Sequence, residues 1–177
     1  MSREGVPYNG LLYAGLMVKE NRPKVVEYNC RFGDPETQIV LPILDGDLLE
    51  LLYKASDPAG REKLPEFGHN GKSAVCVVVA SAGYPGPADT GHPIEGVEAV
   101  RSHSDAVLFH AGTGLQDGKL INKGGRVLNV VGIGDDLPAA RDHAYEAASS
   151  IGFDGAFYRR DIAWRGMEAL GRPLGQA

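Results

Sequence analysis

The hydrophobic pattern at the start of the chain predicts a β-hairpin. Residues 8–18 are apolar at both alternating sets of positions, which is typical of a strand buried on both faces inside a sheet. Residues 19–23 are polar and predict a turn, and residues 24–30 are again rich in β-forming side chains. We therefore expect two paired strands joined by a short, exposed loop.

Helix signals follow the hairpin. Asp34 is expected to be an N-cap, with Pro35 at the first helical position and the helix running to about Ile43. Asp45 is expected to cap a second helix over residues 48–55. The sequence then becomes polar and rich in proline and glycine, which indicates a domain boundary.

The second half predicts a sheet with one long helix. Residues 73–81 are strongly β-branched, and the sequence Gly-Tyr-Pro-Gly after them is typical of a turn. Further strands are expected at residues 106–110, 119–122 and 126–131. A helix is expected over residues 138–151, with a face of small residues at Ala139, Ala140, Ala144, Ala147 and Ala148. This part should be an α+β module of mostly antiparallel character.

Together these patterns predict an α+β protein with two domains. We expect the first over residues 1–58, a linker over residues 59–72 and the second over residues 73–177. The formal charge of −5 argues against nucleic acid or an acidic membrane as a partner, and favours small molecules or proteins.

The expected location is the reducing cytoplasm. Cys30 and Cys76 show no CxxC spacing, so neither a disulfide framework nor a structural zinc site is indicated. The sequence also contains no run of 18 apolar residues, and the N-terminus lacks the apolar core of a signal peptide.

Candidate chemistry is concentrated on the second strand of the hairpin. Side chains two residues apart on a strand point the same way, so Glu27, Asn29 and Arg31 are expected to share one face. A carboxylate and an amide carbonyl are hard oxygen ligands that suit Mg²⁺ together with substrate phosphates. The Arg31 guanidinium is suited to a phosphate or a carboxylate.

A solvated polar face is the alternative interpretation of the same alternation, because antiparallel sheets commonly show it. The continuation Arg-Phe-Gly-Asp-Pro-Glu favours a site, since a glycine and a helix start would leave backbone donors near the polar face. Asp34 and Glu36 are ambiguous between this site and a structural role, and a helix cap and a first-turn acid are the favoured interpretation. From the residues alone, the strand is a candidate metal and anion site.

Six segments resemble successive blocks of the phosphoribosylamine-glycine ligase family, also called glycinamide ribonucleotide synthetases, within the ATP-grasp superfamily. They are PYNGLLYAGLMV, KVVEYNCRFGDPETQIVLPIL, ASAGYPG, FHAGT, GGRVLNVVG and FYRRDIA. The resemblance implies the C-terminal part of an ATP-grasp domain followed by a small C-terminal domain. It also implies ligation of glycine to 5-phosphoribosylamine with ATP, through a glycyl phosphate, in purine synthesis.

By the same resemblance, Glu27 and Asn29 would be ligands of Mg²⁺ or Mn²⁺, and Arg31 would stabilise the glycyl phosphate or its transition state. Many ATP-grasp enzymes carry another acidic metal ligand on the preceding strand, but residues 8–17 offer none. Members of the family also begin with domains that this sequence does not contain before Met1. We therefore expect a fragment that needs those N-terminal domains as a partner and is inactive alone.

Two other functions fit the sequence. One is a non-catalytic binding or scaffold module, suggested by the absent N-terminal domains. The other is an ATP-grasp ligase with a different substrate, because a fold and a metal site do not fix the substrate.

Several further signals are weaker. Residues 114–119 resemble a phosphate-binding loop, but the glycine spacing is one residue short, so a hairpin turn is expected. The glycines at 132 and 134 are not followed by the third glycine of a dinucleotide fingerprint. His110 and residues 124–126 could contact substrate or form a packed turn. Residues 159–161 are expected to form the ion-paired end of a strand.

Overall fold

The computed structural model describes residues 1–57 and 64–171, which form two compact units. The first unit takes residues from 1–37 and 44–70, and the second takes residues 38–43 and those from 71 onward. Helices and antiparallel strands make up both, which confirms the expected α+β class. Part of the expected linker, residues 59–63, lies outside the described residues, and the expected domain bounds stay a prediction.

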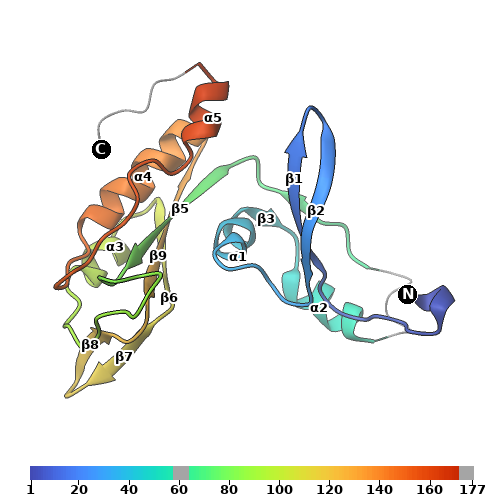
Figure 1. The fold of residues 1–177 in the computed structure, drawn as a ribbon. Coiled ribbons are helices and arrows are strands. Elements are labelled where there is room, and N and C mark those ends of the chain that lie inside the picture. Colours follow the sequence, from blue (N-terminus) through green and yellow to red (C-terminus); the bar gives the residue numbers. More distant parts are fainter. Residues whose placement is uncertain (58–63, 172–177) are drawn as a thin grey trace. The chain divides into compact units, whose positions relative to one another are not determined.

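The chain up to residue 70 forms short elements (Figure 1). In order, these are a 3-10 turn η1 at Ser2–Glu4, β1 at Tyr13–Lys19, β2 at Arg22–Asn29, α1 at Glu36–Val40, a 3-10 turn η2 at Leu41–Ile43, β3 at Leu44–Asp45, α2 at Leu48–Ser56 and β4 at Gly68–His69. Strands β1 and β2 pair antiparallel, as do β3 and β4.

The β1–β2 hairpin is confirmed, but its expected burial is wrong. Glu20 and Asn21 in the turn both have left-handed φ angles, 52° and 58°, which match the twist of the paired strands. However, Met17 is 60% exposed and Val26 is 67% exposed. The hairpin is a sheet of two strands, and within the described residues no third strand pairs with it, so its apolar side chains remain open to solvent.

Both helix starts in this unit differ from expectation. Helix α1 begins at Glu36, one residue later than expected, and η2 continues it as a 3-10 turn. Helix α2 is capped by Asp47, whose Oδ1 accepts a hydrogen bond of 2.8 Å from the Glu50 amide. The spacing of Asp47 and Glu50 is that of a capping box, whereas Asp45 is paired in β3.

The second unit is built on a three-stranded antiparallel sheet in the order β5-β9-β6, with β7 and β8 forming a separate pair (Figure 1). Its elements are β5 at Ser73–Ala80, α3 at Val97–Arg101, β6 at Ala106–His110, β7 at Thr113–Gln116, β8 at Lys119–Asn122, β9 at Arg126–Gly134, α4 at Leu137–Ser149 and α5 at Trp164–Ala169. The four expected strands and the long helix are confirmed. Elements α3, β7 and α5 were not predicted.

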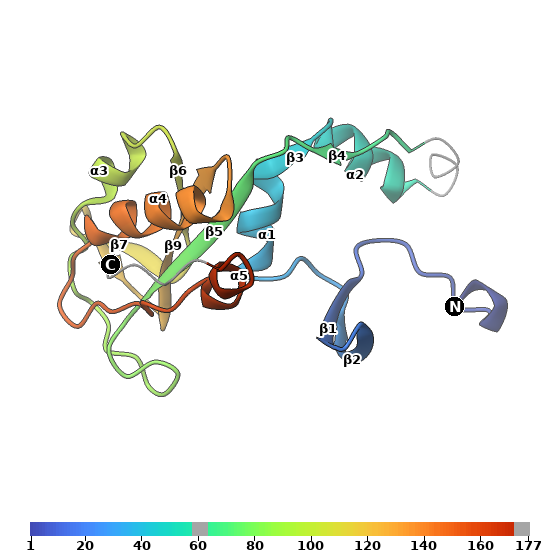
Figure 2. The ribbon, with the colours of Figure 1, turned by 90° about the horizontal axis from the view of Figure 1, so that it is seen from above.

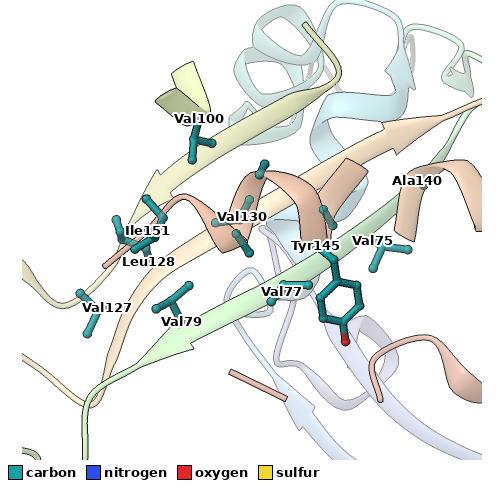
Figure 3. Close-up of a cluster of buried hydrophobic side chains, with 13 residues drawn as sticks. Val75, Val77, Val79, Val100, Val127, Leu128, Val130, Ala140, Tyr145 and Ile151 are labelled. Carbon is teal, nitrogen blue, oxygen red and sulfur yellow. The ribbon is translucent and has the colours of Figure 1, made fainter. Parts of the chain in front are cut away.

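Helix α4 packs on one face of this sheet and forms the hydrophobic core there (Figures 2 and 3). Figure 3 labels Val75, Val77, Val79, Val100, Val127, Leu128, Val130, Ala140, Tyr145 and Ile151. The alanine face expected on α4 is buried at four of its five positions, and Ala139 is half-buried. Burial of this apolar surface is the main favourable term in the stability of the unit.

Two glycines of β9 explain why the helix can lie so close. A methyl group at Gly132 would overlap the carbonyl oxygen of Ala140 and the amide nitrogen of Ala144. One at Gly134 would crowd the Ala140 amide in the same way. The two glycines of this Gly-Ile-Gly sequence therefore allow α4 to pack closely against β9.

Polar contacts fix the segments around the sheet. Asn122, fully buried, donates to Ser81 Oγ and to the Asp89 carbonyl at 2.8 Å each, and accepts from the His92 amide at 2.7 Å. Left-handed φ angles at Asp117 and Gly118 form the turn of the β7–β8 hairpin, confirming the turn expected there.

The segment after α4 is held by buried polar groups that sequence reasoning did not single out. Tyr145 Oη donates to the Arg159 carbonyl at 2.8 Å and accepts from the Ile162 amide at 3.0 Å. Arg141 lies over the Tyr145 ring, 4.7 Å from its centroid. Asp161 accepts two hydrogen bonds from Arg159, which holds the pKa of the Asp161 carboxyl below its usual value and forms the ion pair expected here.

Candidate functional site on the hairpin

The hairpin places four of its residues around one face. Glu27 lies opposite Gly15, and Asn29 lies opposite Tyr13. Next to Glu27 the register shifts, so that Val26 is an extra residue on β2 between the Glu27–Gly15 and Val25–Leu16 pairs. Such β-bulges re-aim the side chains beside them and are frequent next to active sites.

Glu27 and Asn29 are brought together as expected from their spacing. Asn29 Nδ2 donates a hydrogen bond of 2.9 Å to Glu27 Oε1. Asn29 is half-buried and Glu27 is exposed. The contact fixes the carboxylate and the amide on the same side of β2. Asn29 makes this hydrogen bond through Nδ2, so the bond does not use its carbonyl oxygen.

This donor set fits a divalent cation held by few protein groups. A carboxylate and an amide oxygen are the ligand types that Mg²⁺ and Mn²⁺ take, and phosphate oxygens and water can supply the others. Across the described residues, no group of three or more histidine, cysteine, aspartate or glutamate side chains could hold a metal.

Arg31 lies two residues beyond Asn29, after the end of β2. Its Nη1 donates to the Phe32 carbonyl at 2.8 Å, which holds the side chain against the backbone at the start of the turn. Arg31 acts on the Tyr13 hydroxyl by lowering its pKa, opposing the larger effects described below. The structure gives no contact between Arg31 and Glu27 or Asn29 among the hydrogen bonds of the described residues, and the guanidinium acts on Tyr13 only through its charge.

Sequence reasoning did not single out Tyr13 or Gly15, it noted Gly33 only as a source of backbone donors, and it favoured the helix start for Glu36. Tyr13 Oη donates to Glu36 Oε1 at 3.2 Å. The Glu36 carboxylate is the first cause of a raised pKa for the Tyr13 phenol, and Glu27 adds a smaller effect of the same sign.

The two glycines leave room for the two carboxylates. A Cβ at Gly15 would lie 3.3 Å from Glu27 Cγ, and one at Gly33 would lie 2.5 Å from Glu36 Oε2. The distance at Gly33 is shorter than real Cβ contacts, so a larger residue at position 33 would require the Glu36 side chain to move.

Comparison with known proteins identifies both parts of the chain. A family model described as the phosphoribosylglycinamide synthetase ATP-grasp (A) domain matches residues 1–37, which include the whole hairpin. The model of the C domain of the same synthetase matches residues 74–165. The first match places the hairpin in an ATP-grasp domain. The chain belongs to the phosphoribosylglycinamide synthetase family.

Individual relatives agree with this assignment. Phosphoribosylamine-glycine ligases of Leptospira interrogans and Caldanaerobacter subterraneus are 49% and 45% identical over 93% and 92% of this chain. A human trifunctional purine biosynthetic protein, adenosine-3, is 44% identical over 98% of it. The crystal structure of phosphoribosylamine-glycine ligase from Thermotoga maritima matches 90% of the chain with a TM-score of 0.77 and 36% identity.

The chain spans only part of these relatives. It covers 38% of the two bacterial ligases and of the Thermotoga structure, and 17% of the human protein. None of the helices within the described ranges is both long and apolar enough to cross a membrane.

Proposed function

We propose that this chain forms part of an enzyme that ligates glycine to 5-phosphoribosylamine with ATP, giving glycinamide ribonucleotide, ADP and phosphate. The observation that carries the proposal is the Glu27–Asn29 pair, joined at 2.9 Å on the strand that matches the ATP-grasp domain. The names of the bacterial relatives support glycine and phosphoribosylamine as the substrates. We place the reaction in the cytoplasm, the reducing setting that the cysteine usage suggests.

In this reaction, a glycine carboxylate oxygen attacks the γ-phosphorus of ATP, giving glycyl phosphate and ADP. The amine of phosphoribosylamine then attacks the glycyl carbonyl carbon, phosphate leaves, and the amine loses a proton. Both steps concentrate negative charge on phosphate oxygens, so catalysis depends on placing positive groups beside them.

Three residues of this chain would meet that requirement. The Glu27 carboxylate and the Asn29 carbonyl would hold Mg²⁺ or Mn²⁺, which when bound neutralises phosphate charge and acts as a Lewis acid. Arg31 would direct its guanidinium donors to the transferred phosphoryl group or to the glycyl phosphate. The hydrogen bond between Glu27 and Asn29 orients the two oxygen donors before a ligand arrives.

The proposed partner of the chain is the amino-terminal portion of the same kind of enzyme. The apolar side chains of the hairpin support this, since Leu16, Met17 and Tyr28 are all more than half exposed. Large apolar side chains exposed on both faces of a hairpin favour burial against another part of a protein. We expect the isolated chain to be inactive because it spans only 38% of the length of the bacterial ligases.

Complementation tests the proposal. The chain is mixed with the amino-terminal portion of the Caldanaerobacter relative that it does not align with, and this pair is called the complemented enzyme. With ATP, Mg²⁺, glycine and phosphoribosylamine, glycinamide ribonucleotide should form, and neither part alone should make it. An assembled but inactive pair would favour the scaffold alternative, and product from another amino acid alone would favour a different substrate.

A further inference from the structure

Residues between 159 and 166 line a cavity of about 340 Å³. They run from the segment after α4 into α5, which lies next to α4 in Figure 1, and all of them belong to the second unit. Trp164, the single tryptophan of the chain, forms the aromatic wall of the cavity and is 40% exposed. A tryptophan that is open to solvent beside a cavity offers apolar surface to a ligand.

The backbone of this cavity is held in a strained conformation. Ala163, in the middle of the lining, has a left-handed φ of 65°, which is unfavourable for a residue that carries a Cβ. The hydroxyl of the buried Tyr145 donates to the Arg159 carbonyl and accepts from the Ile162 amide. The buried Arg141 donates to the Ile162 carbonyl at 3.3 Å. Buried polar groups therefore fix the cavity wall before a ligand arrives, as is frequent at ligand sites.

Charge decides which kind of ligand this cavity suits. Its lining carries two positive side chains, Arg159 and Arg165, and one negative side chain, Asp161. Asp161 accepts hydrogen bonds from Arg159 Nε at 2.8 Å and from Arg159 Nη2 at 2.6 Å, which use two of the five N–H donors of the guanidinium. One positive charge is thus in excess, in a chain whose formal charge is −5. This local excess favours an anionic ligand.

We propose that this cavity binds a nucleoside monophosphate, with the base against Trp164 and the phosphate on Arg159 and Arg165. Bases stack on aromatic side chains, and guanidinium groups suit phosphate oxygens. Arg165 lies over the Trp164 ring, 5.2 Å from its centroid, so the base takes the part of the ring that Arg165 leaves open. A single positive charge in excess matches one phosphate group better than a triphosphate. Asp161 is a positioning residue, because it acts through Arg159.

The inference goes beyond the proposed function, since it requires neither the hairpin nor a bound cation. Its test follows the fluorescence of Trp164 in the full chain, which reports on the cavity because the chain has no other tryptophan. Adenosine 5′-monophosphate (AMP) is titrated at low salt without metal ions and should quench the emission saturably. Adenosine and inorganic phosphate should each bind at least about tenfold more weakly, because each lacks the phosphate contacts or the stacked base.

Arg159→Gln and Arg165→Gln should each weaken AMP binding roughly tenfold, because each removes charge-assisted hydrogen bonds to the phosphate. Arg101→Gln is the matched control. Arg101 is an exposed arginine of the same unit, paired with Glu98 at 2.8 Å and outside the lining of this cavity. Arg101→Gln should bind AMP as the wild type does, and so should Glu27→Gln, which changes the hairpin.

Absence of a saturable quench up to about 10 mM AMP would overturn the inference. Equal affinity for AMP and inorganic phosphate would contradict the stacked base, and equal affinity for AMP and adenosine would contradict the phosphate contacts. Loss of AMP binding in Glu27→Gln would move the ligand to the hairpin. Emission that changes when the free chain is diluted would instead assign Trp164 to a contact between two copies of the chain.

Discussion

Glu27→Gln lowers the ligation rate of the complemented enzyme roughly 10³-fold or more. Cation clamps on transferring phosphoryl groups contribute several kcal/mol, and each 1.36 kcal/mol is a factor of ten in rate. Glutamine keeps the size of the side chain and can still accept from Asn29 Nδ2, so the loss comes from the charge. The measurement is the rate of glycinamide ribonucleotide formation at saturating ATP and glycine.

Glu20→Gln is the matched control for this variant. Glu20 is exposed and lies in the turn of the same hairpin, so the substitution removes the same charge far along the strands from Glu27. The control should retain the wild-type rate. A Glu27→Gln rate within a few-fold of wild type would remove Glu27 from the chemistry.

Gly132→Ala should destabilise the second unit by about 3 kcal/mol, at the upper end of the cost of overpacking a core. The added methyl group meets backbone atoms of α4 at Ala140 and Ala144, which cannot rotate away as a side chain can. Helix and sheet therefore have to separate. Urea unfolding followed by the fluorescence of Trp164 measures this, because the single tryptophan lies in α5 within the second unit.

Gly152→Ala provides the comparison. A Cβ at Gly152 would meet no heavy atom within 4 Å, and the residue does not have a left-handed φ. Its unfolding midpoint should therefore stay near that of the wild type. Equal midpoints for the two variants would show that α4 does not depend on the close approach at Gly132.

The parts of the fold that could be predicted are those with a strong local pattern. Strand β5 is almost entirely β-branched or small, and the alanine face of α4 matches the glycines of the strand below it. Helices α3 and α5 were missed because their N-cap residues, Gly96 and Ala163, are left-handed and make no side-chain capping bond. Without a capping side chain, five or six residues give no start signal.

The error over hairpin burial has a different cause. Residues 8–18 carry the side chains of a strand covered on both faces, yet β1 pairs only with β2 within the described residues. A sequence pattern records the surroundings in which a segment is stable, and those surroundings can lie in other parts of an enzyme. The chain covers only 38% of the length of the bacterial relatives, which agrees with a hairpin that is buried by other parts of such an enzyme.

The candidate site was half predictable. Glu27 and Asn29 share a face because strand geometry requires it, and their direct contact confirms this. Tyr13 and Glu36 come from separate elements 23 residues apart, and no periodicity encodes their contact. A contact between residues far apart in sequence depends on tertiary structure, so only the structure reveals it.

Binding of Mn²⁺ to the complemented enzyme, followed by electron paramagnetic resonance with a non-hydrolysable ATP analogue, tests the central claim most directly. The wild type should bind Mn²⁺ in an analogue-dependent manner, and Glu27→Gln and Asn29→Ala should each weaken binding by at least about tenfold. Glu20→Gln should bind as the wild type does. Equal Mn²⁺ affinity in the wild type and Glu27→Gln would contradict a metal site on this face.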